Sequence, residues 1–106
     1  MPKYMAEARY TKEGLPGLIK DGGSGRLNAI RELASSVGGK VECLYYAFGE
    51  TDLFVVLDLP DNVSAVALSL IVNSTGAATT KLTPLLSPEE IDEAARKSVN
   101  YRAPGK

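Results

Sequence analysis

The sequence offers few groups for catalysis, and they are carboxylates, amines and tyrosine hydroxyls. It contains no histidine, which excludes a histidine general base, a Ser-His or Cys-His pair and an imidazole metal ligand. A carboxylate beside Arg and Lys, with a tyrosine hydroxyl nearby, can still bind an anionic small molecule or act as an acid–base pair. We therefore expect neither metal nor cofactor, and a ligand site built from Glu7, Arg9, Tyr45, Phe54, Thr79, Lys81 and Thr83.

Strand alternation is what would place these residues together. Lys3–Tyr10 is predicted to be the first strand and Ala77–Leu86 the fourth, and side chains two apart share a face. Glu7 and Arg9 would then lie beside Lys81 on neighbouring outer strands, facing the side that no helix covers. A hydrogen-bonded dimer interface or a solvated edge explains the same pattern. The opposite, alanine-rich face of the first strand leaves room for helices to pack closely.

The stretch from Val41 to Leu59 predicts a hairpin at the centre of the fold. Val41–Phe48 and Asp52–Leu59 are rich in aliphatic and aromatic residues, and a short break containing Gly joins them. We expect these two runs to be the central antiparallel strands. In the turn, Gly49 would supply a positive φ and Asp52 would bind nearby backbone. Alternatively, the carboxylates of Glu50 and Asp52 would line the rim of a cavity between subunits.

The first helical region is predicted in two parts. Leu15–Lys20 forms a short helical turn, and Ser24 caps a helix from Arg26 to Val37 with one apolar stripe. Gly38 and Gly39 end that helix. The glycine-rich stretch Asp21–Arg26 could also hold a phosphate at a helix start. It lacks the Lys-Ser/Thr ending of a P-loop, so capping is the simpler interpretation.

Two further helices follow from capping and apolar patterns. The helix over residues 63–74 is apolar almost all round, which indicates burial on more than one side, with a second subunit as one of those sides. Ser87, Pro88 and Glu90 start a third helix. The order predicts an α+β, ferredoxin-like βαββαβ fold with a four-stranded antiparallel sheet and an added C-terminal helix. Residues 1–99 would form this domain, and residues 100–106 a flexible tail.

Composition narrows the cellular context. The 106 residues carry a net charge of −1 without a basic stripe, which argues against a nucleic-acid partner. No apolar run reaches the roughly 18 residues that span a membrane, and no signal peptide is evident. Cys43 is the single cysteine, more often a small buried hydrophobe than a nucleophile. We expect a cytoplasmic protein.

Several segments resemble the GYD domain family of small bacterial proteins. They are Arg9–Thr11, Gly14, Gly38–Asp52 and Thr79–Leu85. The family motif falls on Gly49, Thr51 and Asp52, with Thr51 where the family has tyrosine. The resemblance implies a fold similar to dimeric α+β barrel proteins, in which two sheets pack face to face. Relatives at the level of fold include cofactor-free monooxygenases, isomerases, haem-using enzymes and regulatory ligand-binding domains.

Two functions follow as hypotheses. The first is a homodimer or larger homo-oligomer that binds a small ligand between subunits. The alternative is a cofactor-free dimeric α+β barrel enzyme of the monooxygenase or isomerase type, acting on a small organic molecule. Its acid–base pair would be Glu7 with Arg9, Tyr45 or Lys81. A stress-linked or regulatory sensor is a third hypothesis, and no residue pattern points specifically to it.

Overall fold

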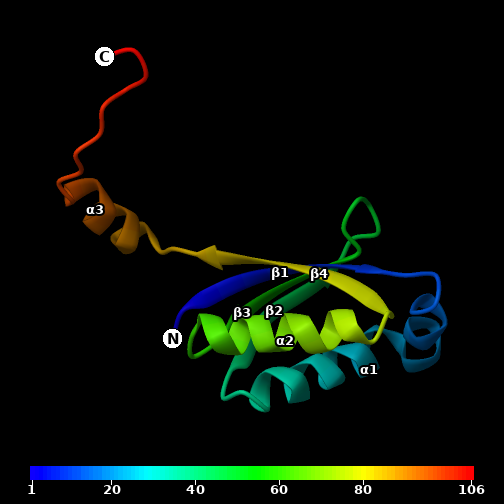
Figure 1. Ribbon diagram of the computed structural model, residues 1–106. Helices are drawn as coiled ribbons and strands as arrows, with labels where there is room; N and C mark the ends of the chain where they lie inside the picture. The colour runs from blue at the N-terminus through cyan, green and yellow to red at the C-terminus, as the bar shows by residue number, and fades with distance from the viewer.

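The computed structural model describes all 106 residues, and its elements follow the predicted order (Figure 1). The strands are β1 (Lys3–Tyr10), β2 (Lys40–Tyr46), β3 (Leu53–Asp58) and β4 (Ala78–Leu85). The helices are α1 (Leu15–Ser35), α2 (Asn62–Ser74) and α3 (Pro88–Arg96). The fold is α+β and ferredoxin-like, with α3 added at the C-terminal end. None of the helices is long and apolar enough to cross a membrane.

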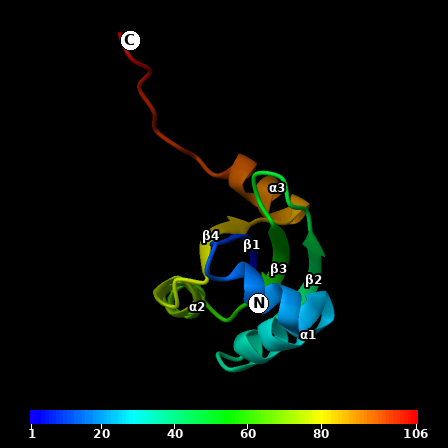
Figure 2. The ribbon, with the colours of Figure 1, turned by 90° about the vertical axis from the view of Figure 1, so that its right-hand side faces the viewer.

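The four strands form one antiparallel sheet in the order β2-β3-β1-β4. Helices α1 and α2 lie on one face of this sheet, and the other face has no helix packed on it (Figure 2). The prediction that both hairpin strands are central was wrong, because β2 is an edge strand. The prediction that β1 is an outer strand was also wrong. Each helical crossover skips a strand position, so β1 lies between β3 and β4.

The core lies between the sheet and the two helices, as alternation predicts. Tyr4 and Ala8 of β1 are buried on this side with Val55 of β3 and Leu68 of α2. The most deeply buried large side chain is Leu59, which follows β3. The odd-numbered residues of β1 therefore face the uncovered side, which we call the open face.

Helix α1 differs from the prediction at its start. It begins after Gly14, and the two expected parts join into one helix with a kink at Gly22, where φ is 74° and ψ is 166°. Ser24 lies inside the helix, so its predicted role as an N-cap was wrong. Glycine at position 22 adopts the left-handed φ without strain, and the helix resumes at once. The helix ends at Ser35, just before Gly38, whose φ is 80°.

Helix α2 begins as predicted and is covered on one side. The carboxylate of Asp61 accepts a hydrogen bond from the backbone N–H of Ser64 at 2.8 Å, which caps the helix. Ala65 and Leu68 are buried against the sheet. The outer side of α2 is apolar and exposed in the protomer, at Val63, Val66, Leu70 and Ile71.

Helix α3 and the residues after it project away from the body of the protein (Figure 1). Ser87 and Glu90 form the predicted capping box, in which the Ser87 hydroxyl accepts from the Glu90 N–H and the Glu90 carboxylate accepts from the Ser87 N–H. No residue of α3 is buried. The start of this helix is thus fixed locally, while its apolar residue Ile91 has no cover.

Candidate functional site on the open face

One row of side chains crosses all four strands of the open face. In the strand register, Tyr45 of β2 lies opposite Phe54 of β3, and Phe54 lies opposite Glu7 of β1. Glu7 in turn lies opposite Lys81 of β4. Directly opposed residues in an antiparallel sheet point to the same face. Four of the seven predicted site residues therefore form a continuous line of two aromatic rings, one carboxylate and one ammonium group.

The charged end of this row contains an ion pair. The Lys81 Nζ atom lies 3.9 Å from a Glu7 carboxylate oxygen, and the two side chains are 78% and 27% exposed. At this distance and exposure the pair contributes little to stability. The Lys81 ammonium is therefore largely accessible to a ligand, and the Glu7 carboxylate partly so.

The remaining predicted residues flank the row on both sides. Arg9 lies opposite Thr79, and Thr83 lies opposite Met5. Arg9 and both threonines are exposed. The structure therefore brings all seven predicted residues onto one face. Among these seven, Arg9 and Lys81 are the cations and Glu7 is the carboxylate.

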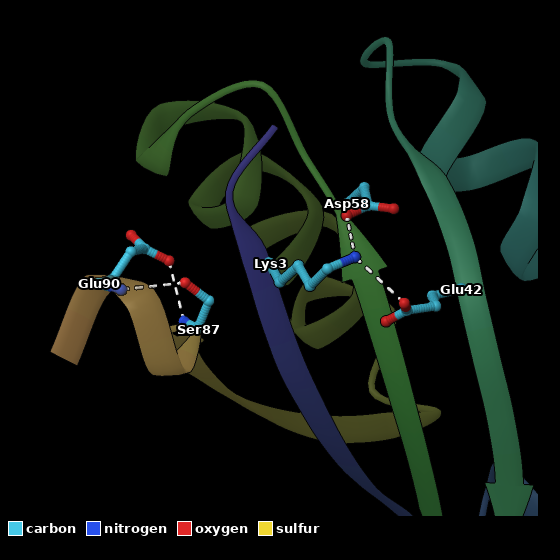
Figure 3. Close-up of polar contacts among 5 residues, drawn as sticks. All are labelled: Lys3, Glu42, Asp58, Ser87 and Glu90. Carbon is cyan, nitrogen blue, oxygen red and sulfur yellow. Dashed lines mark hydrogen bonds and ion pairs between the residues drawn. The ribbon is translucent and has the colours of Figure 1, made fainter. Parts of the chain in front are cut away.

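A second charged group on the same face was not predicted (Figure 3). The Lys3 ammonium donates to the Asp58 carboxylate at 2.8 Å and to the Glu42 carboxylate at 3.1 Å. The hydrogen bond from Lys3 holds the pKa of the buried Asp58 carboxyl below its usual value. The bonds to Asp58 and Glu42 raise the pKa of Lys3. Lys3 and Asp58 share the strand parity of Glu7 and Phe54, a signal that could have found them.

Glu42 joins this cluster because of an irregularity in strand pairing. The register shifts between Val41 and Cys43, so Glu42 occupies the extra position of a bulge. Alternation alone gives no sign of this insertion. Cys43 itself is half-buried and lies opposite Val56.

The motif turn is held by backbone contacts. The Asp52 carboxylate accepts from the backbone N–H of Tyr10 at 2.9 Å, and the Asp52 N–H donates to the Ala8 carbonyl at 2.9 Å. This supports the structural interpretation of Asp52, while Glu50 is exposed. The predicted positive φ at Gly49 was wrong: Phe48 has the positive φ, 53°. The Phe48 ring stacks on Tyr46 with centroids 6.5 Å apart, a contact that helps to hold this conformation.

The stretch Asp21–Arg26 has a simple structural explanation. It forms the kinked part of α1, where Arg26 lies 3.6 Å from the Asp21 carboxylate, and nothing there supports the alternative of a phosphate loop. No three carboxylate or thiol groups lie close enough to share a metal ion. The open face therefore remains the candidate site.

The fold and the open face define the class of protein as a small ferredoxin-like α+β domain with one face of its sheet uncovered. The chain matches the GYD domain over residues 4–95 and belongs to that family. The match includes the four strands, α1 and α2, and ends within α3. No functionally curated protein matches the chain.

Proposed function

We propose that this GYD-domain protein forms a homo-oligomer through the open face, and that a small polar or anionic ligand binds between the two sheets. The observation that carries the proposal is the uncovered row from Tyr45 to Lys81. A two-fold contact pairs a surface with itself. A surface with two aromatic rings, a carboxylate and an ammonium group can pack against its own copy and still leave polar groups for a ligand.

The exposure of aromatic and apolar side chains supports assembly. Tyr45 is 72% exposed on the edge strand β2, at one end of the row. The outer side of α2 adds a second exposed apolar surface, with Leu70 at 66% and Ile71 at 60%. Contiguous apolar surface of this kind typically marks a protein contact. Sheet-to-sheet contact would give a dimer, and contact through α2 would extend the dimer to a larger assembly.

Helix α3 also supports the proposal that the protein assembles with a second copy of itself. Isolated helices of fewer than about 12 residues are marginal in water, and α3 has nine residues, none of them buried. Its apolar residue Ile91 is 52% exposed. Packing of α3 on a neighbouring subunit would supply the cover that the protomer does not. With one cysteine and no disulfide, such an assembly suits a reducing compartment, and we place it in the cytoplasm.

The test is the molar mass in solution, measured by size-exclusion chromatography with light scattering at micromolar concentration. We expect a dimer or larger for the natural sequence and a monomer for Tyr45→Asp, because each subunit would bury a carboxylate at the contact. Asn28→Asp, an exposed position on α1, adds the same charge and should leave the mass unchanged. A monomeric natural protein, or an unchanged mass for Tyr45→Asp, would contradict the proposal.

A second surface variant separates the two contacts. Leu70→Asp changes the outer side of α2 and leaves the open face intact. It should reduce the mass only when the natural assembly is larger than a dimer. If Leu70→Asp instead turns a natural dimer into a monomer, the dimer contact lies on α2. That result would contradict the choice of the open face.

The Glu7–Lys81 pair favours an enzymatic function as the second candidate. A half-buried carboxylate can take a proton from a carbon acid, while the neighbouring ammonium stabilises the anion that forms. This is the first step of an isomerase-type reaction. Incubating the protein in D₂O with a panel of small ketones and lactones tests it, with deuterium incorporation followed by NMR. Incorporation that survives Glu7→Gln and Lys81→Met together would exclude these roles.

A further inference from the structure

A cavity lies on the other side of the sheet, between α1 and α2. It has a volume of about 100 Å³, and 12 of its 15 lining residues are hydrophobic. On β1 its floor consists of the small side chains of Ala6 and Ala8, and larger sheet residues such as Val55 complete it. Because the cavity lies over Ala6 and Ala8, the expectation that helices pack closely on the alanine-rich face of β1 was wrong. The walls come from Ile30 of α1 and Val72 of α2, and the helices stand apart above the alanine floor.

The cavity continues into a wider hollow of about 370 Å³ beside the first half of α1. The two spaces share several lining residues, including Tyr10, Arg26 and Val72. We treat them as one groove, narrow and almost wholly apolar at one end and wider at the other. Proteins bind small ligands in concave, mostly apolar spaces that carry a few placed polar groups.

Arg26 is the one charged residue that lines the narrow apolar end. Its side chain is 35% exposed, and its guanidinium lies 3.6 Å from the Asp21 carboxylate, which leaves several of its five N–H donors free. The other two polar residues there are Ser69 and Thr80, whose hydroxyls already bond each other at 3.0 Å. An arginine at the boundary of an apolar space matches a carboxylate whose remaining atoms are apolar.

We propose that the groove between α1 and α2 binds a monocarboxylate with a flexible apolar chain. Its carboxylate would lie on Arg26, and its chain would lie over the alanine floor between Ile30 and Val72. The site is separated from the open face by the sheet, so it stands independently of the proposed function. Apolar cavities of similar size bind apolar guests without polar assistance, and Arg26 adds the preference for an anion.

The test compares three ligands with one chain length: octanoate, 1-octanol and octylamine, titrated by calorimetry. We expect octanoate to bind most tightly, with one site per protomer, and octylamine most weakly. Arg26→Gln should weaken octanoate binding about tenfold, the loss of one charge-assisted hydrogen bond, and leave 1-octanol unchanged. Arg31→Gln, an exposed position on the same helix, is the matched control and should bind octanoate normally.

The location is tested separately. Val72→Phe fills the groove at a residue that lines both of its parts and should abolish binding of octanoate and 1-octanol alike. NMR chemical shifts of the backbone amides also locate the binding site, and they need only the natural protein. Octanoate should shift the amide resonances of Ala6, Ala8 and Ala78 and leave that of Tyr45 unchanged. Unsaturable binding, equal losses in Arg26→Gln and Arg31→Gln, or shifts confined to the open face would each overturn the proposal.

Discussion

Glu7 of β1 and Lys81 of β4 lie directly opposite each other, with 3.9 Å between the carboxylate and the ammonium group. They belong to a row that reaches across the whole sheet to Tyr45. Because no helix covers this face (Figure 2), the row is free to meet a second sheet.

Gly14 and Gly17 should respond to alanine in opposite directions. A Cβ at Gly14 would lie 1.8 Å from the Ala77 carbonyl oxygen, whereas a Cβ at Gly17 would meet nothing within 4 Å. Gly14→Ala should lower the free energy of unfolding by about 1–3 kcal/mol through forced backbone movement. Gly17→Ala, inside α1, should raise it by about 0.5–1 kcal/mol. Urea titration measures both, and equal responses would contradict the close approach of α1 to Ala77.

The pair between Asp58 and Lys3 should stabilise the protein near neutral pH and lose this effect in acid. The Lys3 hydrogen bond lowers the pKa of Asp58 in the folded state, so the unfolded state binds more protons as the pH falls. The stabilisation is fully present above the unfolded pKa of about 3.9 and is lost as the pH falls through the lowered folded value. Asp58→Asn should remove this part of the acid dependence of Tm. Glu50→Gln, exposed and unpaired, should keep it, and an identical pH profile for Asp58→Asn would show that the pair contributes nothing.

Asp52 should anchor the motif turn to β1. Asp52→Ala removes the acceptor for the Tyr10 N–H, and the expected loss is about 1 kcal/mol. Hydrogen exchange at Tyr10 should accelerate, while exchange at the centre of β1 remains slow. Glu50→Ala in the same turn should change neither. Unaltered protection of Tyr10 in Asp52→Ala would contradict the anchoring role.

Helix α3 should matter for assembly and little for the fold of one protomer. Ile91 contacts no buried core, so Ile91→Asp should change protomer stability by less than about 0.5 kcal/mol. It should nevertheless weaken self-association, measured by sedimentation at graded concentrations. Asp92→Asn on the same helix is the control. A loss of protomer stability with unchanged association would place α3 against its own subunit.

Local chemistry in the sequence predicted much of this fold. The capping box at Ser87, the alternation of β1 and the cap of α2 at Asp61 are each determined by neighbouring residues, and all three were confirmed. The apolar pattern of α2 predicted burial on more than one side, and the protomer covers only one. The kink at Gly22 was missed because one glycine can absorb a break that otherwise needs a loop. The position of β2 at the sheet edge depends on long-range crossovers, which no local pattern reveals.

In the candidate site, too, local patterns predicted some features and long-range packing determined the others. Placing Glu7 and Lys81 together required only strand parity, and the structure places them there. The Lys3–Glu42 contact required the bulge between Val41 and Cys43, and the groove beside Arg26 required the separation of two helices. Both depend on packing between segments that are far apart in the sequence, so local sequence patterns did not predict them.

The most direct test of the central claim is a crystal structure of the protein, purified gently and crystallised at neutral pH. The account predicts two copies whose open faces pack together, with Glu7 and Lys81 enclosed and non-protein density beside them. A dry, fully packed contact would contradict the ligand site between the sheets. Open faces left in solvent, with no partner across Tyr45, would contradict the assembly itself.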